Sequence, residues 1–163
     1  MRAAVLFLSG TIVGALFMTS LAAQGTVNTG LRLNHVGISV PNFQETVAFY
    51  EKVMGFRVSH RFAPNPDGRP GTAFVQISRD TFIEIAPAAP DAKPTITHLG
   101  IGADDIKATV ARLTQYGGKP TEPRPSANSG SILANITDPA GIRTELNEQP
   151  PGSMMRQAID SWK

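Results

Sequence analysis

Residues 33–55, LNHVGISVPNFQETVAFYEKVMG, recur weakly but in register as residues 96–118, ITHLGIGADDIKATVARLTQYGG. The offset between the two copies is 98 − 35 = 63 residues. The positions that coincide at this offset include His35 and His98, Gly37 and Gly100, Ile38 and Ile101, and Gly55 and Gly118. A repeat of this length indicates two copies of one supersecondary unit, related by a pseudo-twofold axis.

The first copy predicts a strand, a helix and three further strands. Residues 33–40 alternate with period two, which is typical of a strand with one packed face. Asn42 is expected to cap the helix that follows, and Gly55 suits the position just beyond its end. The predicted buried stripe of this helix, at i, i+4 and i+7, is Phe43, Val47 and Tyr50. The three further strands are expected over residues 56–62, 72–78 and 81–86.

The second copy repeats this plan after a proline-rich linker, residues 87–94. Asp105 is expected to cap a helix that runs to about Tyr116. A loop over residues 119–130, rich in Pro, Ser and Asn, covers the place where a weak strand should lie. The remaining strands are expected over residues 96–102, 131–137 and 142–147.

The composition narrows the classes of protein to consider. A chain of 163 residues is long enough for one domain with a sizeable core. Its formal net charge is only +2 and its basic residues are scattered, so nothing predicts a nucleic-acid partner. The chain has no cysteine, so any metal must be held by nitrogen and oxygen donors.

The two ends of the chain lie outside the repeat. Residues 1–23 combine Arg2, an apolar run and small residues, which predicts a cleaved signal peptide or an uncleaved N-terminal anchor. The folded part is therefore expected to be periplasmic or secreted, or else membrane-anchored outside the cytoplasm. Residues 24–30 are expected to form a spacer. Residues 149–163 are a tail with the spacing of a short helix, which predicts either a strap over the domain or a dimer contact.

Four side chains carry the candidate chemistry. Each copy opens with a histidine and holds a glutamate in a later apolar strand. The alternation of strand side chains turns these groups away from the helical layer, toward one shared cavity. Two buried carboxylates would repel each other, and a divalent cation removes that difficulty. The predicted ligands of one divalent metal ion, such as Zn, Ni, Mn, Co or Fe, are His35, Glu84, His98 and Glu145. The alternative is a pair of hydrogen-bonded histidines with solvated glutamates.

These segments resemble the vicinal oxygen chelate superfamily, and glyoxalase I in particular. The resemblance covers residues 31–148 and rests on the motifs LNHVGISV, FYEKVMGF, FIEI, ITHLGIG and TDPAGIRTEL. It implies an α+β fold of two tandem βαβββ modules, residues 31–86 and 96–148, that form a half-barrel around a metal-binding cavity. The site could close within one chain or across a homodimer that exchanges modules.

The resemblance also implies a reaction class. A glyoxalase- or epimerase-type isomerase or lyase acts on a small substrate with two adjacent oxygens, through an enediolate that the metal stabilises. Glu145, and after it Glu84, is the expected catalytic base. Arg61 and Arg124 are candidates for binding a substrate carboxylate. The alternatives are an extradiol-type iron dioxygenase, with His60, Tyr50 or Tyr116 beside the metal, and a non-catalytic binding or resistance module.

Overall fold

The computed structural model describes residues 29–163. The predicted signal peptide or anchor, residues 1–23, lies outside the described residues, as does nearly all of the spacer. Within the described part, no helix is long and apolar enough to cross a membrane.

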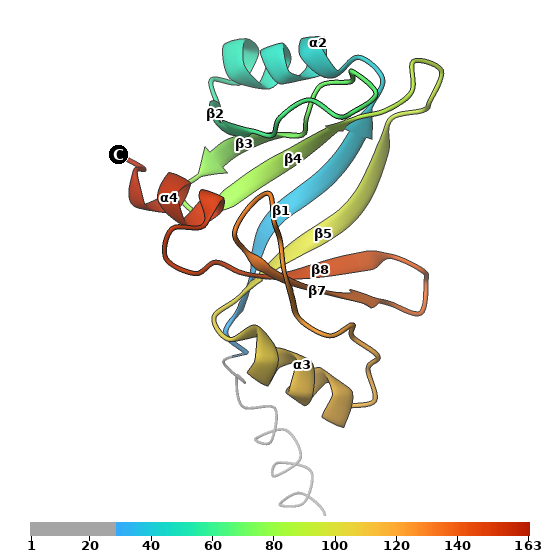
Figure 1. Ribbon diagram of the computed structural model, residues 1–163, viewed down its shortest axis with the longest axis vertical. Coiled ribbons are helices and arrows are strands. Elements are labelled where there is room, and N and C mark those ends of the chain that lie inside the picture. Colours follow the sequence, from blue (N-terminus) through green and yellow to red (C-terminus); the bar gives the residue numbers. More distant parts are fainter. Residues whose placement is uncertain (1–28) are drawn as a thin grey trace, which may run out of the picture.

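One curled, unclosed sheet of eight strands organises the molecule, in the order β2-β3-β4-β1-β5-β8-β7-β6 (Figure 1). Its two central strands come from different modules and pair antiparallel, whereas β4 and β8 pair parallel to their own module's first strand. This confirms the α+β class and the two modules. The strands are β1 Leu31–Val40, β2 Arg57–Arg61, β3 Ala73–Ser78, β4 Thr81–Pro87, β5 Thr95–Ala103, β6 Arg124–Pro125, β7 Ile132–Thr137 and β8 Arg143–Glu148.

The helix of the first module covers one end of the sheet. It begins as α2, Phe43–Ala48, and continues as a π-helical turn, η1, Phe49–Val53. The sequence predicts one regular α-helix here, and the wider π turn shifts the following side chains around the axis. Asn42 forms no side-chain cap to the backbone, contrary to expectation. The predicted stripe still packs inward, in a core of Val40, Phe43, Val47, Ala73, Val75 and Ile85, with Tyr50 against it.

The helix of the second module, α3 (Ile106–Gln115), covers the other end of the sheet (Figure 1). The Asp105 carboxylate accepts a hydrogen bond from the Ala108 N–H at 2.9 Å, as a capping residue should. Ile106 packs on Leu146, the neighbour of Glu145 in β8, so the helix side of β8 is apolar as predicted. The weak strand of this module is reduced to the two residues of β6, because prolines in the preceding loop and in β6 itself cannot donate to a ladder.

The C-terminal tail forms a third helix, α4 (Met154–Asp160), which lies on the first module (Figure 1). Its apolar side is buried against Phe74 and Phe82 of the same chain. Arg57 holds the end of the helix, since its guanidinium donates to the Ala158 carbonyl at 2.8 Å. Within one chain the tail is therefore a strap, the first of its two predicted roles.

Candidate metal centre

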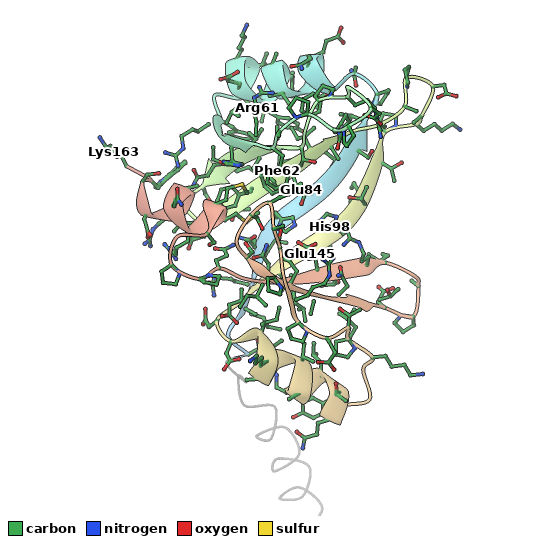
Figure 2. All side chains as sticks on the ribbon, in the orientation of Figure 1. Arg61, Phe62, Glu84, His98, Glu145 and Lys163 are labelled. Atoms are coloured by element: carbon green, nitrogen blue, oxygen red, sulfur yellow. The ribbon has the colours of Figure 1, made fainter. Side chains whose placement is uncertain are left out.

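Four side chains from four neighbouring strands meet inside the half-barrel: His35 of β1, Glu84 of β4, His98 of β5 and Glu145 of β8. One ligand atom of each lies within 4.8 Å of the other three. Figure 2 shows Glu84, His98 and Glu145 converging from their separate strands. All four donors belong to one chain, so no second subunit is needed to bring them together. The histidines are almost completely buried and the glutamates are partly exposed.

The pairing of β1 with β5 places the histidines against each other. In the register, His35 lies opposite Gly100, and Gly37 lies opposite His98. A methyl group on either glycine would overlap the ring of the facing histidine. Each module's glycine therefore leaves room for the other module's imidazole, which explains why the motif His-x-Gly occurs in both copies of the repeat.

Two bulges in the same strand pair supply the second partner of each histidine. The register skips Asn34 on β1 and Thr97 on β5, and these residues are equivalent in the repeat because 34 + 63 = 97. Bulges redirect side chains and are common beside active sites. Here the Asn34 Oδ1 lies 3.0 Å from the His35 Nδ1, and the Thr97 Oγ1 lies 2.9 Å from the His98 Nδ1.

These partners set the tautomer of His35. The Asn34 amide nitrogen donates to the Asp80 carbonyl at 3.1 Å, so its oxygen faces His35 as an acceptor. We therefore assign the ring proton of His35 to Nδ1, which leaves the lone pair on Nε2 free for a metal. The Thr97 hydroxyl can accept from His98 in the same way. The two Nε2 atoms are 2.9 Å apart, a spacing that suits either a hydrogen bond between the two rings or a cation bound by both.

The spacing of the donors fits a small divalent ion. Bonds of about 2.1 Å place neighbouring ligand atoms about 3.0 Å apart at right angles and about 3.4 Å apart in a tetrahedron. The His35 Nε2 lies 3.4 Å from Glu84 and 3.6 Å from Glu145, and the His98 Nε2 lies 3.5 Å from Glu84. Two imidazoles and two carboxylates suit borderline first-row ions. The cluster could therefore hold one divalent metal.

Burial affects the pKa of His35 and of both glutamates. It lowers the pKa of His35 to about 4, so this imidazole is neutral at pH 7. Burial, together with the charge of Glu84, raises the pKa of Glu145. Burial also acts to raise the pKa of Glu84, but its contacts with His98 and His35 outweigh that effect and lower the pKa overall.

The low pKa of His35 predicts a pH-dependent stability for the metal-free protein. The unfolded chain takes up a proton near pH 6.5, and the folded chain does so only near pH 4. The contribution of neutral His35 is thus complete above pH 6.5 and is lost as the pH falls toward 4, amounting to about 2 kcal/mol between pH 7 and 5. Denaturant unfolding of the metal-free wild type and of His35→Gln, each at pH 7 and pH 5, measures this contribution. It is the difference between the pH dependences of the two proteins. An equal pH dependence in the two proteins would contradict this assignment.

Two of the four donors, Glu84 and Glu145, line a small cavity beneath the C-terminal strap. Its volume is about 70 Å³. The roof combines α4 with the loop before β7, and the Met154 N–H donates to the Ser129 carbonyl at 2.8 Å to join them. The residues around this cavity are Phe62, Phe74, Glu84, Ser126, Ser129, Leu133, Glu145, Asn147 and Met155.

Several sequence candidates do not reach this cavity. Arg61 and Arg124 are exposed and absent from its lining, and their predicted contact with a substrate carboxylate stays a prediction. Tyr116 is 80% exposed and Tyr50 packs in the outer core, while His60 lies at a separate groove between β2 and α4.

Other site residues escaped the sequence analysis. Asn34 and Thr97 precede the two histidines at the repeat offset, so the repeat itself could have identified them. Asn147 follows Glu145 by two residues, and period-two alternation puts it on the same face. No local pattern identifies Met155, because α4 reaches the cavity only through tertiary packing.

Known proteins share this sequence pattern and this fold. The chain is 29% identical to the lactoylglutathione lyase of Salmonella typhimurium over 126 residues, which cover 72% of this chain and 93% of that enzyme. It is 25% identical to the lactoylglutathione lyase of Neisseria meningitidis over 130 residues, covering 75% and 94%.

Solved structures show the same fold at lower sequence identity. Methylmalonyl-CoA epimerase from Mycobacterium tuberculosis superposes with a TM-score of 0.62 at 22% identity, covering 73% of this chain and 88% of that one. A variant of the Streptomyces coelicolor methylmalonyl-CoA epimerase, in complex with 2-nitronate-propionyl-CoA, gives a TM-score of 0.61 at 23% identity, covering 75% and 96%.

A match to a family as a whole agrees with these pairwise similarities. The sequence model of the Glyoxalase/Bleomycin resistance protein/Dioxygenase superfamily matches residues 32–146, which contain both modules and all four candidate ligands. With the paired modules and the His/Glu cluster, this match shows that the chain belongs to the Glyoxalase/Bleomycin resistance protein/Dioxygenase superfamily.

Proposed function

We propose that this protein is a divalent-metal-dependent isomerase or lyase that moves a proton at a carbon next to a carbonyl group. The observation that supports this most is the convergence of two buried imidazoles and two carboxylates, whose ligand atoms all lie within 4.8 Å of one another. The similarity to lactoylglutathione lyases supports the same reaction class.

The four residues of the His/Glu cluster have different roles in this proposal. His35, His98 and Glu84 hold the metal, and their short mutual distances suit that role. A bound divalent cation would act as a Lewis acid on a substrate carbonyl and stabilise the negative charge that develops there. Glu145 takes the proton, because its contact with His35 is longer and its raised pKa suits a general base.

The substrate in this proposal is small and lies outside the cytoplasm. The predicted signal peptide or anchor supports that location. A cavity of about 70 Å³ has the volume of roughly two water molecules in the liquid. The reacting part of the substrate is therefore only a few atoms long, and any glutathione- or CoA-like conjugate would have to remain outside the cavity.

The arrangement gives less support to an extradiol-type dioxygenase. That alternative needs a histidine or tyrosine beside the metal to assist oxygen chemistry. None of the three candidates, His60, Tyr50 and Tyr116, lines the cavity. Glu84 would also be a superfluous fourth ligand for such an enzyme.

The test of the proposal combines metal analysis with isotope exchange. We expect the purified protein to bind one divalent ion per chain and to incorporate solvent deuterium next to the carbonyl of at least one probe in D2O. The probes are dihydroxyacetone, S-lactoylglutathione and methylmalonyl-CoA, followed by NMR. Metal binding without exchange in any of them would argue against the proton-transfer reaction. Oxygen consumption with catechol and Fe(II) would favour the dioxygenase instead.

Asn34 offers a test of the ligand geometry. We expect Asn34→Leu to weaken Zn2+ binding about 10- to 100-fold, because the His35 ring loses the acceptor that fixes its tautomer. Asn34→Asp keeps an acceptor at that position and should retain the affinity. Calorimetry gives the affinity, and imidazole nitrogen NMR of the metal-free protein gives the tautomer. Unchanged Zn2+ binding and an unchanged tautomer in Asn34→Leu would exclude this role.

A further inference from the structure

Asn147 places an unpartnered polar group in the wall of the cavity beneath the C-terminal strap. It lies two residues beyond Glu145 on β8 and faces the same side, while Leu146 between them packs against α3. Its side chain is only 3% exposed. The Asn147 Oδ1 is nevertheless one of the buried side-chain atoms without a hydrogen-bond partner.

The contact of Asn147 with Met155 assigns the direction of its amide. Its Nδ2 approaches the Met155 sulfur at 3.9 Å, and the Gln149 Nε2 approaches the same sulfur at 3.3 Å. With the nitrogen directed at Met155 of α4, the oxygen remains as an open acceptor. A buried acceptor without a partner destabilises the fold, so we expect a water molecule or a ligand to donate to it.

The position of this acceptor limits the ligand that can reach it. Residues two apart in a strand are separated by about 7 Å, so Asn147 lies a few bonds away from groups beside Glu145. Half of the other residues in the wall are apolar, namely Phe62, Phe74, Leu133 and Met155. The other half are polar or charged, namely Glu84, Glu145, Ser126 and Ser129. The same small volume must contain both the reacting group and whatever contacts Asn147.

We propose that Asn147 is a specificity-determining residue that accepts a hydrogen bond from a hydroxyl group of the substrate. The substrate class is a small hydroxylated carbonyl compound, with one hydroxyl placed beyond the pair of oxygens that faces the metal ligands. This inference rests on the proposed function, because it assumes that those two oxygens are held by a metal at the His/Glu cluster.

A matched pair of probes tests this role. Propionohydroxamate and glycolohydroxamate chelate a metal through the same two adjacent oxygens and differ only by a methyl group in place of a hydroxyl. We expect the Zn2+-loaded wild type to bind glycolohydroxamate about tenfold more tightly, measured by calorimetry. Asn147→Leu should lose that preference. Asn128→Leu, an exposed change in the roof loop, should keep it.

Every outcome of this experiment either supports or overturns the role of Asn147. Equal affinities in the wild type, a preference that survives in Asn147→Leu, or no binding of either probe to the Zn2+-loaded protein would overturn the role of Asn147. Asn147→Val replaces the leucine variant if circular dichroism shows that the latter is unfolded. If the wild type binds no Zn2+, the proposed function fails by itself. The probes are then titrated into metal-free protein, where a preference lost in Asn147→Leu supports the subsite and its absence refutes it.

Discussion

Replacing Gly100 by alanine is expected to weaken metal binding at the His/Glu cluster strongly while the sheet stays folded. The added methyl group would occupy the space of the His35 ring, which lies directly over this glycine. The His35 ring is completely buried and is hydrogen-bonded to the Asn34 side chain, so it cannot move aside without leaving the cluster. We expect Zn2+ affinity to fall by more than about 100-fold, because a ligand itself is displaced and not only its supporting partner.

Gly102 provides a matched control on the same strand. A methyl group there meets its nearest neighbour, the Arg32 side chain, at 3.4 Å, which requires little rearrangement. Gly102→Ala should therefore bind Zn2+ like the wild type. Gly37→Ala should behave like Gly100→Ala, because the His98 ring lies over Gly37 in the same way. Calorimetric titration with Zn2+ compares all three, and wild-type affinity in Gly100→Ala would refute the packing argument.

Replacing Glu145 by glutamine is expected to lower the rate of deuterium exchange about 1,000-fold with a much smaller effect on metal affinity. An amide cannot take the proton, but its oxygen can still face the metal. Glu84 is the comparison, since it lies 3.4 and 3.5 Å from the two imidazole nitrogens. Glu84→Gln should therefore weaken Zn2+ binding more than Glu145→Gln does.

The pH dependence of the exchange rate is a second test of Glu145 as the base. Burial raises the pKa of Glu145 in the metal-free protein, and a bound cation would act to lower it. The base must be deprotonated, so the exchange rate should rise with pH through the pKa that results. Exchange into dihydroxyacetone, or into whichever probe the wild type accepts, is followed by NMR from pH 5 to 8. If Glu145→Gln retains the wild-type rate while Glu84→Gln loses it, the two roles must be exchanged.

The alternation of residues in the sequence predicted a side chain's direction correctly where that direction depends only on its own strand. Alternation predicted that Glu84, between Ile83 and Ile85, would turn away from the helical layer. Ile83 and Ile85 indeed pack in the core beneath α2, and Glu84 lines the cavity. The spacing of Phe43 and Val47 identified the buried side of the helix for the same reason.

The same patterns did not predict the places where the backbone departs from regular helix or strand geometry. The π turn at residues 49–53 and the bulges at Asn34 and Thr97 change which way neighbouring side chains point. These irregularities depend on how the strands and helices fit each other, and the alternation of polar and apolar residues does not encode that fit. The bulges matter most, because they bring Asn34 and Thr97 to the histidines.

The sequence by itself predicted the two modules and the four candidate ligands, because the repeat and the strand alternation can be read directly from the order of residues. Only the tertiary structure decided that His35 and His98 meet within one chain, since that depends on the antiparallel register of β1 with β5. It also decided that α4 covers the cavity and brings Met155 beside Asn147. These contacts arise from apolar surfaces far apart along the chain, and such surfaces become complementary only when the sheet has curled.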